Sequence, residues 1–110
     1  MKTIHETLAQ EVIPSLRALL AMKLTTTHSL SQTEAAKRMG LSQPAISQYL
    51  KSLRGLKTTV ITGHPKLSED LEKLAANTAS GALSPEQQTR EIETFCQQII
   101  SLDVLKAFCE

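Results

Sequence analysis

The side chains best suited to recognition chemistry in this sequence are concentrated between Ser42 and Lys51. Gln43 and Gln48 each carry an amide that can bridge the N6 and N7 atoms of adenine. A serine hydroxyl can donate or accept at a base edge, and a lysine can reach guanine or a phosphate. These residue types predict contacts with the base pairs of double-stranded DNA. The candidate base-reading residues are Ser42, Gln43, Pro44, Ser47, Gln48 and Lys51.

Charge is divided unevenly between the two halves of the chain. Residues 1–60 carry eight basic and three acidic side chains, whereas residues 61–110 carry four and eight, which gives formal net charges of +5 and −4. A basic segment can neutralise phosphates, although a chance division of solvated surface charge would look the same. The candidate phosphate contacts are Gln32, Thr33, Lys37, Arg38, Arg54 and Lys57.

Two short helices are predicted to position these side chains. Ser31 begins a capping box, in which its oxygen accepts from the backbone N–H of Glu34 while the glutamate side chain reaches back. Gly40 is expected to end that helix, because glycine adopts the left-handed conformation without a Cβ penalty. Ser42 then caps a second helix with Pro44 in its first turn. This second helix is expected to end near residue 55.

The spacing of small and apolar residues in these helices is typical of a helix-turn-helix from Gln32 to Lys51. Ala36 is small enough to let the two helices cross closely, and Gly40 supplies the sharp turn. Ile46 locks the second helix onto the first, and Tyr49 shares its apolar face. Pro44, Ser47, Gln48 and Lys51 fall on the other face, and Ser42 and Gln43 open the helix. The close crossing and the sharp turn fix the angle between the two helices. This angle lets the second helix enter a major groove, which is about 12 Å wide.

The stretch from Gln32 to Lys51 resembles the motif of the lambda-repressor/Cro (XRE-like) family of DNA-binding proteins. Three segments resemble more closely a group of archaeal predicted transcriptional regulators: IPSLRALLA (13–21), LSQTEAA (30–36) and QPAISQYL (43–50). The resemblance implies that Gln32, which opens the first motif helix, braces Gln43 at the start of the recognition helix. Tyr49 departs from the motif, which usually has an aliphatic residue there, and we expect this tyrosine to be half-buried.

The remaining segments are also predicted to be mostly helical. Apolar residues recur at helical spacing before Ile13 and again from Pro14 to Thr25, as two helices or one kinked helix. Residues 58–64 combine β-branched side chains with a turn signal, which predicts a loop or short extended segment. A further helix is expected to start with the capping sequence Ser84-Pro85-Glu86-Gln87, and a short one from Asp103 to Phe108.

The fold class predicted from these signals is all-α, a helix-turn-helix DNA-binding bundle with additional C-terminal helices. Only three of the 110 residues are aromatic, so aliphatic side chains must fill the interior, which suits packed helices. We expect a DNA-binding head at residues 1–57 with its core at 13–57. The connecting segment at 58–64 then leads to a helical segment at 65–110 that binds a partner.

The apolar stripe of the last long helix has two interpretations. Ile92, Phe95, Ile99 and Leu102 either pack against the first helices as core or form a surface through which two copies dimerise. We expect the dimer, since two heads on half-sites one DNA turn apart gain affinity and read a palindrome. The protein is then a homodimeric transcriptional regulator that acts by occlusion or recruitment at a promoter.

Two other functions stay open. The first is an interaction module, such as the antitoxin-like half of a protein pair, in which the C-terminal helices bind another protein and DNA contact is secondary. Alternatively, Cys96 and Cys109 could form a thiol or metal sensor that switches DNA binding. Cys96 lies on an apolar face, however, which favours a buried and inert thiol.

The sequence contains no recognisable catalytic arrangement, and we expect no enzyme activity. The histidines His5, His28 and His64 are scattered with no cysteine beside them, so neither a metal site nor another cofactor is expected. No small-molecule ligand is identifiable. No apolar run approaches the roughly 18 residues of a membrane span, and the first residues do not form a signal peptide. We therefore expect a cytoplasmic protein with no membrane partner.

Overall fold

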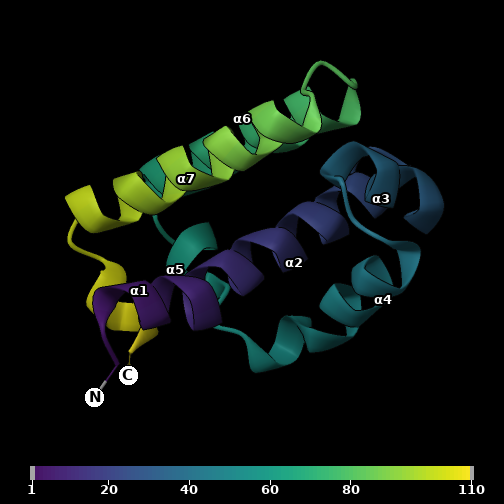
Figure 1. Ribbon diagram of the computed structural model, residues 1–110. Helices are drawn as coiled ribbons and strands as arrows, with labels where there is room; N and C mark the ends of the chain where they lie inside the picture. Colours follow the sequence, from purple (N-terminus) through teal and green to yellow (C-terminus); the bar gives the residue numbers. More distant parts are fainter. Residues whose placement is uncertain (1, 110) are drawn as a thin grey trace.

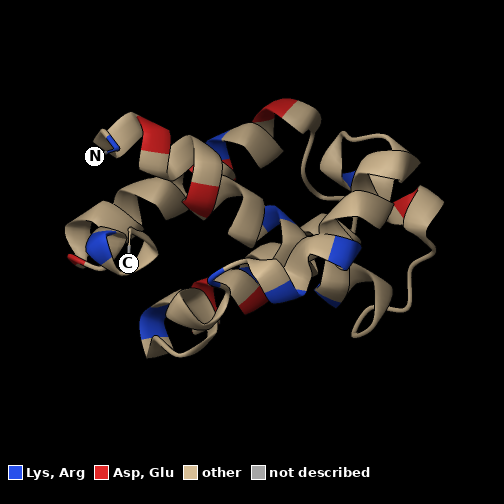
Figure 2. Ribbon diagram, turned by 90° about the horizontal axis from the view of Figure 1, so that it is seen from below, with Lys and Arg blue, Asp and Glu red and all other residues tan. Residues whose placement is uncertain are grey.

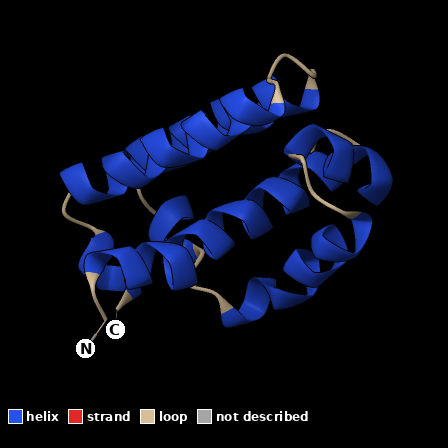
Figure 3. Ribbon diagram, viewed as in Figure 1, coloured by secondary structure: helices blue, strands red, loops and turns tan. Residues whose placement is uncertain are grey.

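The computed structural model describes residues 2–109, and every element in that range is helical (Figures 1 and 3). α2 (Ile13–Thr25) runs through the middle of the molecule. α3 (Gln32–Met39) lies beside the end of α2, and α4 (Gln43–Ser52) packs along one of its sides. The hairpin of α6 (Pro65–Ala79) and α7 (Pro85–Ser101) covers the other side. The all-α fold class predicted from the sequence is confirmed.

Residues 4–25 form one continuous helical run that contains an irregular turn. α1 (Ile4–Thr7) is followed by a π-helical turn, η1 (Leu8–Val12), and then by α2. The wide turn ends two residues before Pro14, which has no N–H to donate, and the N–H of Ile13 donates to the carbonyl of Leu8 five residues back. The hydroxyl of Ser15 donates to the carbonyl of Glu11 at 2.7 Å. Of the two interpretations of this region, the single interrupted helix is therefore correct.

α2 is buried around almost its whole circumference. Leu16, Leu20 and Leu24 have no exposed surface, and Ala18 and Ala21 are equally buried. A helix that is apolar on all sides needs partners on all sides. Helices from both halves of the chain supply them and form one hydrophobic core around α2. Despite this apolar character, neither α2 nor any other helix within residues 2–109 is long and apolar enough to cross a membrane.

Most helix starts follow their capping signals. Ser42 and Ser84 cap α4 and α7, each accepting from the backbone N–H three residues on at 3.2 Å. Ser31 caps α3 in the same way, at 3.1 Å from the N–H of Glu34. The second half of that predicted capping box is wrong, because the Glu34 carboxylate pairs with Arg38 one turn later instead of reaching back.

The loop or short extended segment predicted at residues 58–64 is a helical turn, α5 (Thr59–Thr62). Ile61 is fully buried in the core. The N–H groups of Thr62 and Gly63 donate to the carbonyls of Thr58 and Thr59 at 3.0 and 2.9 Å. Burial of one side chain here overrides the extended preference of β-branched residues. Two 3₁₀ turns complete the described elements, η2 (Leu53–Gly55) after α4 and η3 (Leu105–Phe108) after α7.

The apolar stripe of α7 faces the interior of the molecule. Ile99 is fully buried, Ile92 and Phe95 expose less than a tenth of their surface, and Leu102 is half-buried against the core. Ile92, Phe95 and Ile99 belong to the hydrophobic core of the chain and Leu102 packs against it, and α7 contacts α6, α2 and α3. This burial corrects the assignment of Ile92, Phe95 and Ile99 to a dimer surface, because a side chain in the core has no surface left to offer a second copy. Leu102 is only half-buried, and its part in a dimer stays a prediction.

The left-handed backbone at Gly40, with φ of +68°, gives a test of the turn after α3. Gly40→Ala should lower the free energy of unfolding by about 1 kcal/mol, because a Cβ is disfavoured in this conformation. Gly55 is the matched control, since its backbone is not left-handed and an added Cβ would meet no atom within 4 Å. Urea unfolding followed by circular dichroism compares Gly40→Ala with Gly55→Ala. Equal destabilisation of the two variants would contradict this account of the turn.

Candidate nucleic-acid interface

The turn between α3 and α4 fixes the direction in which α4 projects. Ala36 is buried where the two helices meet, and its carbonyl accepts from the N–H of Leu41 across the turn at 2.9 Å. Ile46 is fully buried and anchors α4 to the core. Tyr49 is half-buried beside it, as expected from the sequence. Apolar contacts therefore hold one face of α4 and leave the other face free.

The free face of α4 is polar and contains no acidic side chain. Gln43, Pro44, Gln48 and Lys51 are exposed, and Ser47 is half-buried. The division of this helix into an apolar and a polar face, predicted from the sequence, is confirmed. The candidate base-reading residues are thus brought together on one accessible surface.

The side chain of Gln43 is held in place by a second glutamine. Its Nε2 donates to Oε1 of Gln32 at 2.6 Å, which joins the first residue of α4 to the first residue of α3. This is the hydrogen bond that the family resemblance implies. A primary amide has two N–H donors and a carbonyl acceptor, so Gln43 retains one donor and its acceptor for a further partner. That pair matches the N7 acceptor and N6 donor of adenine.

Two other candidate base-reading residues make local hydrogen bonds within α4. Ser42 accepts the capping N–H of Ala45, and its own hydroxyl hydrogen can still donate. Nε2 of Gln48 lies 3.3 Å from the hydroxyl of Ser52, on the exposed side of the helix. These contacts restrain the side chains without burying them.

Acidic side chains are rare in the part of the sequence that contains α3 and α4. Residues 12–68 of the sequence contain only one, Glu34, and its carboxylate is paired with Arg38 at 3.0 Å. Figure 2 views the molecule from the side on which α4 lies in Figure 1, and several Lys and Arg positions lie in the middle of this view. The exposed cations of this region that form no ion pair within residues 2–109 are Lys37, Lys51 and Arg54.

Two of the predicted phosphate contacts are engaged inside the protein. Nη1 of Arg38 donates to the carbonyl of Ala79 at 2.9 Å, in addition to its pairing with Glu34. Nζ of Lys57 donates to the carbonyl of Phe108 at 3.3 Å. These partners are 41 and 51 positions away in the chain, so no local pattern indicates them. Arg38 and Lys57 therefore each have a partner inside the protein, and their contact with phosphate stays a prediction. The other candidates are Gln32, Thr33, Lys37 and Arg54.

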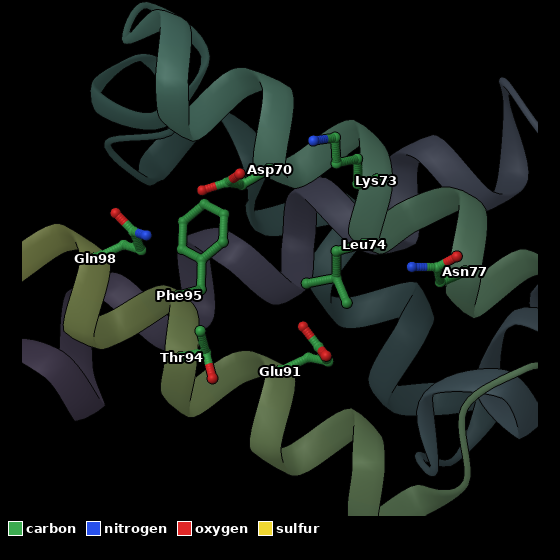
Figure 4. A pocket seen from close by; sticks show the side chains of 8 residues that line it. All are labelled: Asp70, Lys73, Leu74, Asn77, Glu91, Thr94, Phe95 and Gln98. Carbon is green, nitrogen blue, oxygen red and sulfur yellow. The ribbon is translucent and has the colours of Figure 1, made fainter.

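A groove of about 270 Å³ lies between α6 and α7 (Figure 4). The ring of Phe95 lies there beside the side chains of Asp70 and Gln98, and Glu91 lines the same groove. In Figure 1 this hairpin lies across α2 from α4. Carboxylates repel phosphate, so the groove forms no part of the candidate interface.

The two cysteines are free and differ in exposure. Cys96 is buried, and desolvation is the main cause that raises the pKa of its thiol, with the nearby Glu93 carboxylate acting in the same direction. Cys109 is exposed, with its Sγ 3.5 Å from Oγ1 of Thr7. Within residues 2–109, no group of three His, Cys, Asp or Glu side chains is placed to hold a metal ion.

No protein-family model, curated protein or solved structure matches this chain. The resemblance to XRE-like regulators therefore depends on the motifs within residues 13–57.

The burial of Cys96 predicts different reactivities for the two thiols. In the native protein a disulfide reagent such as DTNB should modify Cys109 rapidly and Cys96 slowly, because burial and a raised pKa disfavour the reactive thiolate. When the pH is raised to the ordinary pKa of a thiol, Cys96 should still react more slowly than Cys109. In urea, where the protein is unfolded, the two thiols should react at the same rate. Cys109→Ser isolates the signal of Cys96. Two equally fast thiols in the native protein would contradict the packing of α7.

Proposed function

We propose that this protein binds double-stranded DNA with sequence specificity, using α3 and α4 as a helix-turn-helix. α4 is the recognition helix, and its polar face enters the major groove. The observation that carries the proposal is the amide of Gln43, which Gln32 holds at 2.6 Å on the polar face of a helix that has no acidic side chain. A side chain that is already restrained loses less conformational entropy when it binds a base edge.

The charge around this surface supports the same proposal. Lys37, Lys51 and Arg54 are exposed and make no ion pair within the described residues. Each phosphate that a cation neutralises releases condensed counterions, which favours binding at low salt. In this arrangement the cations position the protein on the backbone, and Gln43 and Gln48 specify the sequence.

We further propose that the protein is a cytoplasmic transcriptional regulator of the XRE-like helix-turn-helix class, acting by occlusion or recruitment at a promoter. Each chain supplies one α4, and a single recognition helix reads few base pairs. Two copies on half-sites about 34–36 Å apart would read a longer, palindromic operator, so the proposed functional form is a homodimer. Its interface would use residues other than the buried Ile92, Phe95 and Ile99 of α7.

Selection of bound sequences from a random duplex library tests this proposal. We expect enrichment of one sequence that binds at least about 10³-fold more tightly than random duplex, with affinity that falls steeply as salt is raised. A palindromic sequence would support the homodimer, and a single half-site would contradict it. The absence of both enrichment and salt-dependent binding would overturn the proposal and indicate that α3 and α4 bind a partner protein.

Replacement of Gln43 tests base readout at the level of one side chain. Gln43→Ala should weaken binding to the selected duplex by about 1–3 kcal/mol and relax the preference at one base position. Random duplex should be affected little, because the amide does not contact phosphate. Gln97→Ala removes an exposed amide from α7 and is the matched control, with no effect expected on either duplex. Equal losses on selected and random duplex, measured by fluorescence anisotropy, would contradict base reading by Gln43.

A further inference from the structure

The guanidinium of Arg38 lies in a site built by two separate elements. Its Nε and Nη2 both lie 3.0 Å from Oε1 of Glu34, one turn earlier in α3. Its Nη1 donates to the carbonyl of Ala79, the last residue of α6. A positive charge is also favoured at this position because it meets the negative end of the α6 helix dipole.

Arg38 supplies a hydrogen-bond donor to the C-terminal end of α6. The last carbonyls of a helix have no N–H partner within the helix. In the turn that follows α6, backbone N–H groups donate to the carbonyls of Ala76, Asn77 and Thr78. The carbonyl of Ala79 instead accepts from Nη1 of Arg38. The guanidinium therefore completes the cap of a helix that lies 41 positions away in the chain.

The turn between α6 and α7 is shaped around this guanidinium. Gly81 has a φ of +78°, in the left-handed region that favours glycine. A Cβ at Gly81 would also overlap Nη1 of Arg38. Glycine is thus suited to this position both by its backbone conformation and by the space that the arginine occupies.

The same junction lies close to the start of α4. A Cβ at Gly40, in the turn after α3, would lie 3.8 Å from Cβ of Pro85, the first residue of α7. Gln43 follows three residues after Gly40 and opens α4. A shift of the end of α3 against the α6–α7 turn would therefore move the residue that the proposed function places at a base edge.

We propose that Arg38 is a positioning residue for DNA recognition. It fastens the end of α3 to the turn between α6 and α7, and so sets the direction in which α4 presents Gln43. It acts through these protein contacts and does not contact phosphate. This inference depends on the proposed function for its effect on DNA, whereas the fastening itself is a property of the free protein.

The variant Arg38→Lys distinguishes a positioning role of residue 38 from a phosphate contact, because lysine keeps the positive charge of arginine. One ammonium group cannot occupy the positions of the three guanidinium nitrogens, so it cannot bond both Glu34 and the Ala79 carbonyl as arginine does. We expect a roughly tenfold loss of affinity for the selected duplex, a smaller loss for random duplex, and an unchanged dependence of log K on log salt. A lysine that merely replaced a phosphate contact would retain most of the affinity for both duplexes.

Lys37→Gln is the matched control on the same helix. Lys37 is exposed, and the structure gives its side chain no ion pair within residues 2–109. Its loss should weaken binding to selected and random duplex alike and reduce the salt slope by about 0.9, the value for one phosphate contact. Arg38→Gln should lower the affinity for the two duplexes as Arg38→Lys does, and it should leave the slope of log K against log salt unchanged.

Proton–nitrogen spectra of the free proteins test the fastening without DNA. Arg38→Lys should shift the amide signals of Ser80–Ala82 and of Gln43–Lys51, whereas Lys37→Gln should leave both groups of signals in place.

If Arg38→Lys does not fold, Glu34→Gln is the second variant. It weakens one hydrogen-bond partner of the Arg38 guanidinium and should shift the same signals by a smaller amount. Unchanged spectra in these Arg38 and Glu34 variants, or wild-type affinity of Arg38→Lys, would overturn the inference. If the wild-type protein binds no DNA, the proposed function fails while the spectra still decide whether Arg38 positions α4.

Discussion

The burial of α2 around almost its whole circumference is the constraint on which the other contacts depend. Leu16, Leu20 and Leu24 have no exposed surface. Full burial of such a side chain contributes about 1.5–3 kcal/mol, and it is achieved only when helices cover every face of α2. α4 covers one side and the α6–α7 hairpin another, so the two halves of the chain stabilise one core.

This shared core links the candidate interface to helices that do not belong to it. α3 and α4 are short, and short helices are stabilised mainly by tertiary packing. Ile46 anchors α4 to the core, and Gln32 restrains Gln43 on its surface. Arg38 joins α3 to the end of α6. A recognition surface supported in this way is pre-organised, which reduces the entropy lost on binding.

The arrangement also separates charges of opposite sign. The single acidic residue among residues 12–68 is neutralised by Arg38, while acidic residues are concentrated in the segment that forms α6 and α7. That hairpin lies across α2 from α4. A molecule with this division is steered by a polyanion so that its basic side approaches first. The groove beside Phe95 belongs to this hairpin and not to the proposed DNA site.

The sequence by itself determined the features that depend on residues within about four positions of one another. These include the serine caps, the left-handed glycine after α3, the two faces of α4 and the all-helical fold, because capping and helical periodicity are local. Only the tertiary structure decided the helical turn at Ile61, the interior position of the α7 stripe, and the partners of Arg38 and Lys57. Their common physical reason is that burial and hydrogen bonding between residues as much as 51 positions apart depend on how the helices pack, which no local pattern encodes.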